Sequence, residues 1–345
     1  MKKYLIILFT FLFVLQTSYT CYAEVPDQKP SFFFGIKKNG TFVSYDDFGR
    51  DNINLDWIYR TGLGYSFNGG FIDTTHFGES LLWTRHYQQE IYKGFLDNDE
   101  HIILKSKKPA LEFHVIIDSS RTLSDYEMKF TSIQLGQYLA YNWAVIHEAM
   151  SWYGYKSTGK FSPISEFGSA FSPEDLYSDL LGTLIASDAL ISSERSDSNE
   201  NFDSACLRIM NEALNGLELQ DANFVDKALE NVKGNWYNGE SYPDNEVWKR
   251  SFDIGLDGCI APCLIKDFNG CPVCLPVPKI PTLDGFSIKV EIKFKEKLQK
   301  QGNILLKIVG KKKKERLAMD DLGPIMEEIK KDYVRKFPEH AGNVK

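Results

Sequence analysis

Residues 135–154, LGQYLAYNWAVIHEAMSWYG, predict a helix that ends at Gly154. The helical segment would begin near residue 124, as one continuous helix or as two. Large aromatic side chains, among them Trp143 and Trp152, give it bulky apolar surface that needs partners inside the protein. We therefore expect this segment to belong to a mostly helical central part of the chain.

Further helices are expected on both sides of this segment. Asp73 is a suitable N-cap for a helix that runs to about Gly94. The sequence Ser172-Pro173-Glu174-Asp175 combines a capping serine, a proline at the first helical position and two acids in the first turn, and predicts a helix that continues to about Leu190. Shorter helices are expected near residues 205–216, 220–233 and 320–336.

Strand patterns occur closer to the ends of the chain. HIILKSKK (101–108) and ALEFHVIID (110–118) form a predicted pair joined at Pro109, and residues 31–48 form another around an Asn39-Gly40 turn. The alternating segment FSIKVEIKF (286–294) predicts a half-exposed strand, with NILLKIVG (303–310) as its expected partner. The predicted fold class is α+β, a mostly helical central domain with short antiparallel strand pairs near the N- and C-terminal ends.

The first 23 residues have the three-part plan of a bacterial secretory signal peptide. Lys2 and Lys3 precede the apolar run YLIILFTFLFVL, and Cys21-Tyr22-Ala23 forms a small-x-small cleavage site. We therefore expect a periplasmic or secreted protein with no transmembrane span after cleavage. The expected organisation is a signal peptide (1–23), a main α+β domain (24–234), an irregular Cys/Pro/Gly-rich segment (235–285) and a C-terminal strand pair with a helix (286–345).

The amino-acid composition excludes several classes of function. The 345 residues carry a formal net charge of −7, with 43% hydrophobic and 14% aromatic residues, so the chain is globular rather than disordered. The acidic balance argues against nucleic acid as a partner, because binding to phosphates needs a basic surface. The chain has no G-x-S-x-G elbow, P-loop or Rossmann glycine fingerprint, which leaves little support for serine hydrolases, nucleotide-binding proteins and dehydrogenases.

Four cysteines cluster in the segment DGCIAPCLIKDFNGCPVC, as Cys259, Cys263, Cys271 and Cys274. In an oxidising compartment such a cluster favours two disulfides. A zinc knuckle is the alternative, because C-x3-C followed by C-x2-C can surround one ion, although the spacer is short for a zinc ribbon. Cys206 is expected to be a buried thiol in its helix.

The dipeptide His147-Glu148 is the first candidate for chemistry. It matches the first half of the H-E-x-x-H zinc-protease pattern, but Ser151 stands where the second histidine would be. A metal at this place would need further ligands from other segments. An interior network of hydrogen bonds explains the same pair without a metal.

Other segments offer those ligands. His76 lies in the first turn of its expected helix, and Asp175 and Asp179 lie one turn apart on theirs. Together with His147 they suit zinc or another divalent metal, and Glu148 would be the general base of a metal-assisted hydrolase. Helix capping also explains Asp175 without a metal. For His76 the alternative is a helix capped by Asp73, with the imidazole left free.

Aromatic residues crowd the same region, and they support two interpretations. Core packing is the simpler one. The other is a cleft that stacks sugar rings, in which Glu148 and an aspartate would act on a cell-envelope glycan. The residues concerned are Tyr138, Tyr141, Trp143, Trp152, Tyr153, Tyr155 and Tyr177.

Three segments, IDTTH (72–76), IHEAMSWYGY (146–155) and SAFSPEDLYSDLLGT (169–183), resemble a family of secreted bacterial proteins, the domain of unknown function numbered 4056. The resemblance implies no established activity, but the segments that carry it also contain the candidate residues of the site. Two hypotheses follow. The first is an exported, peptidase-like, metal-assisted hydrolase that acts on a cell-envelope peptide or glycan. The second is a non-catalytic envelope protein or glycan-binding module whose His/Glu/Asp cluster is structural.

Overall fold

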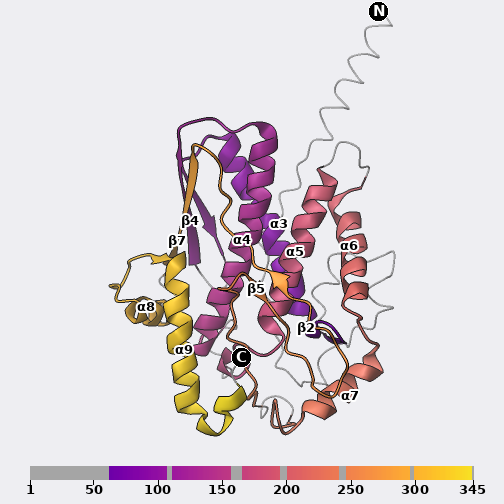
Figure 1. Cartoon of the computed structure of the whole chain (residues 1–345). Coiled ribbons are helices and arrows are strands. Elements are labelled where there is room, and N and C mark those ends of the chain that lie inside the picture. Colours follow the sequence, from indigo (N-terminus) through magenta and orange to yellow (C-terminus); the bar gives the residue numbers. More distant parts are fainter. Residues whose placement is uncertain are drawn as a thin grey trace, which may run out of the picture.

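The computed structural model describes residues 62–106, 111–156, 165–194, 200–240, 246–295 and 299–343. The expected signal peptide and the strand pair around Asn39-Gly40 lie outside these residues. Within them the chain is α+β, as predicted, with long helices at its centre and short antiparallel strands at the sides (Figure 1). None of the helices among the described residues is long and apolar enough to cross a membrane.

Three helices form the centre of the fold: α3 (Thr74–Leu96), α4 (Asp125–Trp152) and α5 (Asp175–Ser193), and each packs against the other two. Local signals start two of them, and the one at Asp73 was predicted. Asp73 caps α3 by accepting hydrogen bonds from the backbone N–H groups of Thr75 and His76, and Ser124 forms a capping box with Glu127 at the start of α4. The segment forms one helix rather than two, and this helix ends at Trp152, two residues before Gly154.

Glycine allows these helices to approach closely. Gly182 on α5 faces the backbone of Phe77 on α3, and a Cβ atom there would overlap the Phe77 carbonyl oxygen. Gly136 on α4 lies against the backbone of Thr84 and Gln88 on α3, where a Cβ would be 2.9 Å from the Thr84 oxygen. Since both neighbours are backbone, the contacts cannot be relieved by turning a side chain.

The helix α5 begins later than predicted. Ser172 is not its cap: the helix starts at Asp175, and the N-cap position is Glu174, which makes no side-chain capping bond. Instead the Ser172 N–H donates to Asp175 Oδ2 at 2.7 Å. The Asp175 carboxylate therefore folds back over a turn that precedes the helix.

The strands near both ends of the described chain join into one sheet. Its order is β3 (His101–Lys105), β4 (Leu111–Ser119), β7 (Phe286–Phe294) and β8 (Leu317–Ala318), all antiparallel. The buried residues of β4, including Leu111, Phe113 and Val115, belong to the same core as the central helices. The sheet and the C-terminal helix α9 (Leu322–Lys336) lie on one side of the helices, and α6 (Phe202–Gly216) and α7 (Ala222–Val232) on the other (Figure 1).

One strand prediction is wrong. The segment NILLKIVG does not pair with β7, because residues 299–308 form the helix α8 (Gln299–Ile308). A short apolar run fits either a strand or a buried helix, and here the spacing of Leu305 and Leu306 buries them as one face of a helix. Strand β7 pairs instead with β4 on one side and with β8 on the other.

The small strands complete the fold. β1 (Leu63–Ser66) and β2 (Gly70–Asp73) form a hairpin before α3, and β5 (Cys259–Ile260) pairs with β6 (Leu275–Pro276). A short 3-10 helix, η2 (Glu166–Gly168), precedes α5, while η4 (Met319–Asp321) and η5 (Pro338–Asn343) flank α9.

The cysteine cluster contains one disulfide among the described residues, Cys259–Cys274, rather than the two expected. Cys263 and Cys271 are thiols, the first buried and the second exposed, and Cys206 is a buried thiol in α6 as predicted. Because Cys259 and Cys274 are linked to each other, the four cysteines cannot all bind one zinc ion as thiolates, and this structure does not contain the zinc knuckle that was the alternative. The proposed domain boundaries stay a prediction, although Phe252, Ile254 and Ile260 from the segment 235–285 belong to the main core.

Candidate metal centre

Three side chains from the three central helices meet inside the protein. His76 of α3, Glu148 of α4 and Asp175 of α5 each offer one ligand atom, and these atoms all lie within 4.8 Å of one another. The side chains are almost inaccessible, with 6%, 3% and 1% of the residue surface exposed. The helix packing therefore brings one imidazole and two carboxyl groups to a single buried point.

His76 is the most unusual member of this cluster, because neither ring nitrogen makes a hydrogen bond within the described part of the chain. Its Nδ1 atom lies 3.2 Å from Asp175 Oδ1 and 3.7 Å from Asp73 Oδ2. Burial alone would lower the pKa of His76, but the carboxylates around it outweigh burial and raise that pKa well above its usual range. The imidazole thus faces acids without a hydrogen bond of good geometry.

Glu148 is oriented by a strained residue. Its Oε2 atom accepts a 2.6 Å hydrogen bond from the backbone N–H of Phe171. Phe171 has a φ of 58°, a left-handed conformation that is costly for a bulky side chain. Burial and the neighbouring Asp175 raise the pKa of Glu148 well above its usual range. The strained conformation of Phe171 thus directs its backbone N–H at the Glu148 carboxylate.

Asp175 and Glu174 share one hydroxyl group. The Oγ atom of Ser172 lies 2.8 Å from Asp175 Oδ1 and 3.0 Å from Glu174 Oε1. Burial raises the pKa of both carboxyls, and His76 opposes the rise at Asp175. The Oε2 atom of Glu174 has no hydrogen-bond partner among the described residues.

Asp179 lies next to this cluster and interacts with it through its charge. Its Oδ1 atom accepts a 2.6 Å hydrogen bond from Ser80 of α3. Burial raises the pKa of Asp179 to about 7, while His76 acts in the opposite direction. The structure therefore gives Asp179 a hydrogen-bond partner on α3 and leaves it outside the group of three.

His147 also lies outside this group. Its Nε2 atom is 3.4 Å from Glu166 Oε2 and 4.0 Å from Glu148 Oε1, so the imidazole is directed mainly at Glu166. Its ring stacks on Trp143 and meets Tyr155 edge-on. Burial lowers the pKa of His147, which favours the neutral imidazole. The sequence pattern did not single out Glu166, which accepts a hydrogen bond from Ser151.

The second residue that the sequence did not reveal is Arg250, whose side chain is 1% exposed. Its guanidinium donates to the carbonyl oxygens of Ala170 (2.7 Å) and Gly168 (2.9 Å), next to Phe171. Burial lowers the pKa of Arg250 to about 10, and nearby acids oppose this. No local pattern in the sequence around Arg250 predicts that this arginine is buried.

Acidic groups outnumber cationic groups around the cluster. Five buried acidic groups gather here, against the cationic groups His76 and Arg250 that act on them. Buried carboxylates without enough compensating charge either take up protons or bind a cation. The five acids are Asp73, Glu148, Glu174, Asp175 and Asp179. This arrangement fits a divalent cation, whose binding would take the place of protons on the acids that ligate it.

The family model described as "Protein of unknown function (DUF4056)" matches residues 57–260, more than half of the chain. The chain belongs to the DUF4056 family. This confirms the family resemblance, and all three residues of the buried cluster lie within the matched region. No curated protein and no solved structure matches the chain.

The aromatic residues of this region serve mainly the core. Five of the seven that the sequence pointed to are at most 5% exposed, so their rings offer little surface to a sugar. Trp152, for example, packs against Phe167, Phe252 and Tyr333. These five residues are Tyr141, Trp143, Trp152, Tyr155 and Tyr177.

Proposed function

We propose that the protein is a metal-assisted hydrolase whose divalent cation is held by His76, Glu148 and Asp175. One observation carries the proposal: three buried ligand atoms, one from each central helix, lie within 4.8 Å of one another. Ligands around zinc lie about 2 Å from the ion, so a small inward movement of these side chains would complete the site. The two ring nitrogens of His76 that lack hydrogen bonds support a role as a ligand.

The donor set narrows the identity of the ion. One imidazole nitrogen and two carboxylate oxygens suit zinc, manganese or iron better than calcium, which prefers oxygen ligands alone. Binding would replace the protons that burial favours on Glu148 and Asp175, because both carboxyls must be ionised to act as ligands.

Three protein ligands also match the plan of catalytic zinc sites, in which a further position is left for water or substrate. Such an ion supplies Lewis acidity to a carbonyl or phosphoryl group. In this proposal Glu148 is a ligand instead of the general base that the sequence favoured. The expected signal peptide and the disulfide Cys259–Cys274 support export, and a cell-envelope peptide or glycan is the substrate class we propose.

A structural ion is the second candidate, and the burial of the cluster favours it. The side chains of His76, Glu148 and Asp175 are almost fully covered, whereas a hydrolase needs a path for its substrate. In this case the ion would hold α3, α4 and α5 together, and the protein would be a non-catalytic component of the envelope.

The test is the metal content of the protein exported to the bacterial periplasm and purified without chelator. We expect about one zinc, manganese or iron ion per chain, lost in His76→Ala and kept in His101→Ala, a control on the edge strand β3. Hydrolysis of peptide or peptidoglycan fragments that is lost with the ion and restored by adding it back supports the hydrolase. A bound ion without such hydrolysis identifies the structural role. Absence of metal after incubation with all three ions contradicts both.

A further inference from the structure

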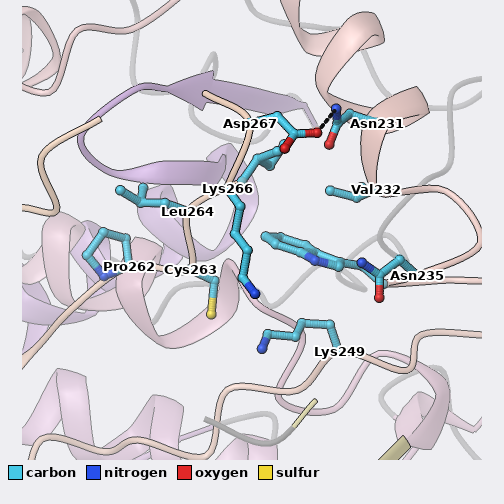
Figure 2. Close-up of a pocket in the computed structure, with 11 residues that line it drawn as sticks. Asn231, Val232, Asn235, Lys249, Pro262, Cys263, Leu264, Lys266 and Asp267 are labelled. Atoms are coloured by element: carbon cyan, nitrogen blue, oxygen red, sulfur yellow. Dashed lines mark hydrogen bonds between the residues drawn. The ribbon is translucent and has the colours of Figure 1, made fainter. Parts of the chain in front are cut away.

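A separate pocket lies at the end of α7, with a volume of about 390 Å³. Its walls come from two stretches of chain, residues 231–236 with Lys249 on one side and residues 262–267 on the other (Figure 2). The volume lies within the range of small-molecule sites. None of the residues of the metal centre lines this pocket.

Two lysines give the pocket its chemical character. The side chains of Lys249 and Lys266 both extend into it, and Figure 2 shows their ammonium groups on the same side of the space. Neither lysine forms an ion pair within the described part of the chain, although the protein as a whole is acidic. Two ammonium groups directed at one space repel each other unless an anion lies between them. The pocket therefore has two cationic donors available for an anionic group.

The acid of the pocket does not neutralise these lysines. The Oδ2 atom of Asp267 accepts a 3.2 Å hydrogen bond from the side-chain amide of Asn231, across the opposite part of the pocket (Figure 2). The carboxylate is thereby held at a distance from the ammonium groups. The pocket has a polar end at Asp267 and Asn231 and a cationic end at the lysines.

Trp236 adds an apolar wall. It lines the pocket, is 8% exposed, and packs edge-on against Phe71 with ring centroids 6.0 Å apart. It belongs to a second hydrophobic cluster with Val232 and Ile265, which fixes the indole in place. Because little of the indole is exposed, it forms one part of an apolar wall together with Val232 and Ile265, and such a wall suits a flat apolar group on a ligand.

We propose that this pocket binds a small organic anion, a carboxylate or a phosphate ester that carries a flat ring. The anionic group lies between Lys249 and Lys266, and the ring packs on the apolar wall formed by Trp236. This binding is independent of the metal centre, so the two proposals can fail separately.

The test uses three probes that share a naphthalene ring: 2-naphthoate, 2-naphthyl phosphate and 2-naphthamide, which is the uncharged isostere of the carboxylate. Binding to the whole mature protein is measured by isothermal titration calorimetry and by saturation-transfer NMR. We expect at least one anion to bind about ten-fold more tightly than the amide, because only the anions carry a negative charge for the two ammonium groups to pair with. Comparison of the two anions distinguishes a carboxylate from a phosphate ligand.

The variants locate the site. In Lys249→Met/Lys266→Met the preferred anion is expected to bind no better than the amide, while Lys307→Met, a surface lysine of α8, keeps the preference. The single variant Lys266→Met serves where the double variant fails to fold, because this side chain is exposed. The proposal is overturned if neither anion binds, if the amide binds equally well, or if the lysine variants keep the wild-type preference.

Discussion

The backbones of Gly182 and Phe77 are in direct contact, where α5 crosses α3 one residue after His76. A side chain at position 182 would push the two helices apart. Since His76 belongs to α3 and Asp175 to α5, this contact fixes the separation of two members of the buried cluster. The geometry of the candidate metal centre thus depends on a glycine that is not part of it.

Gly182→Ala is expected to destabilise the protein by about 1–3 kcal/mol, because the added methyl group meets backbone that cannot rotate away. Urea unfolding of the metal-free protein measures the loss. Gly216→Ala is the matched control, since a Cβ atom at this position of α6 has open space around it and alanine favours the helix. Equal stability of the two variants would show that α3 and α5 do not touch as described.

Arg250→Met is expected to lower stability by about 3 kcal/mol. The substitution leaves the carbonyl oxygens of Gly168 and Ala170 without their donor and removes positive charge beside buried acids. Thermal unfolding of the variant is compared with that of Arg335→Met, whose exposed side chain interacts with Glu328 and Asp332 on the surface of α9. A loss no larger than that of Arg335→Met would mean that Arg250 does not support the loop beside Glu148.

The stability of the metal-free protein is expected to depend on Asp179. Burial raises the pKa of this carboxyl from 3.8 to about 7, so the folded state holds a proton that the unfolded chain releases. The wild type therefore loses stability as the pH rises from about 4 to about 7.

Asp179→Asn removes this titration. Relative to the wild type, the variant is expected to gain stability between pH 4.5 and pH 7.5, on the order of a few kcal/mol. Thermal melts in the presence of chelator at several pH values measure the difference. A difference between the proteins that stays constant with pH would show that Asp179 titrates normally in the folded state.

Loss of the disulfide Cys259–Cys274 is expected to cost about 3 kcal/mol, because the bond closes a loop of 15 residues. Cys274→Ser is compared with Cys271→Ser, a substitution of an exposed thiol that should have little effect. Peptide mapping without reduction identifies the linked cysteines directly. A bond between Cys263 and Cys271 would restore the two-disulfide prediction.

Local signals in the sequence were sufficient for much of the helical framework. Asp73 starts α3 as predicted, because its side-chain oxygen satisfies backbone N–H groups a few residues away, and this depends on neighbours in the chain alone. The capping box of Ser124 and Glu127 acts in the same local way but was not predicted. At Ser172 the same logic failed, because Asp175 turned back to the Ser172 N–H and the helix began later. The apolar run of α8 was wrongly predicted to be a strand, because a short apolar run fits either a strand or a buried helix.

The sequence allowed the candidate residues of the site to be predicted, but not which of their side chains meet. His76, Glu148 and Asp175 stood out as rare or acidic residues at helix positions, and the structure brings these three together. Adjacent residues on a helix point about 100° apart, so only the rotation of α4 decides whether His147 or Glu148 faces the other helices. Glu166 and Arg250 join the surroundings through tertiary packing, which no local pattern records.

The most direct test of the account is a zinc titration, by calorimetry, of protein first stripped with chelator. The comparison is between wild type, His76→Ala, Glu148→Gln and His147→Gln. We predict about one site per chain in the wild type and in His147→Gln, and at least a ten-fold loss of affinity in the other two variants. Binding that survives in His76→Ala but is lost in His147→Gln, or no binding in the wild type, would contradict a metal centre at His76, Glu148 and Asp175.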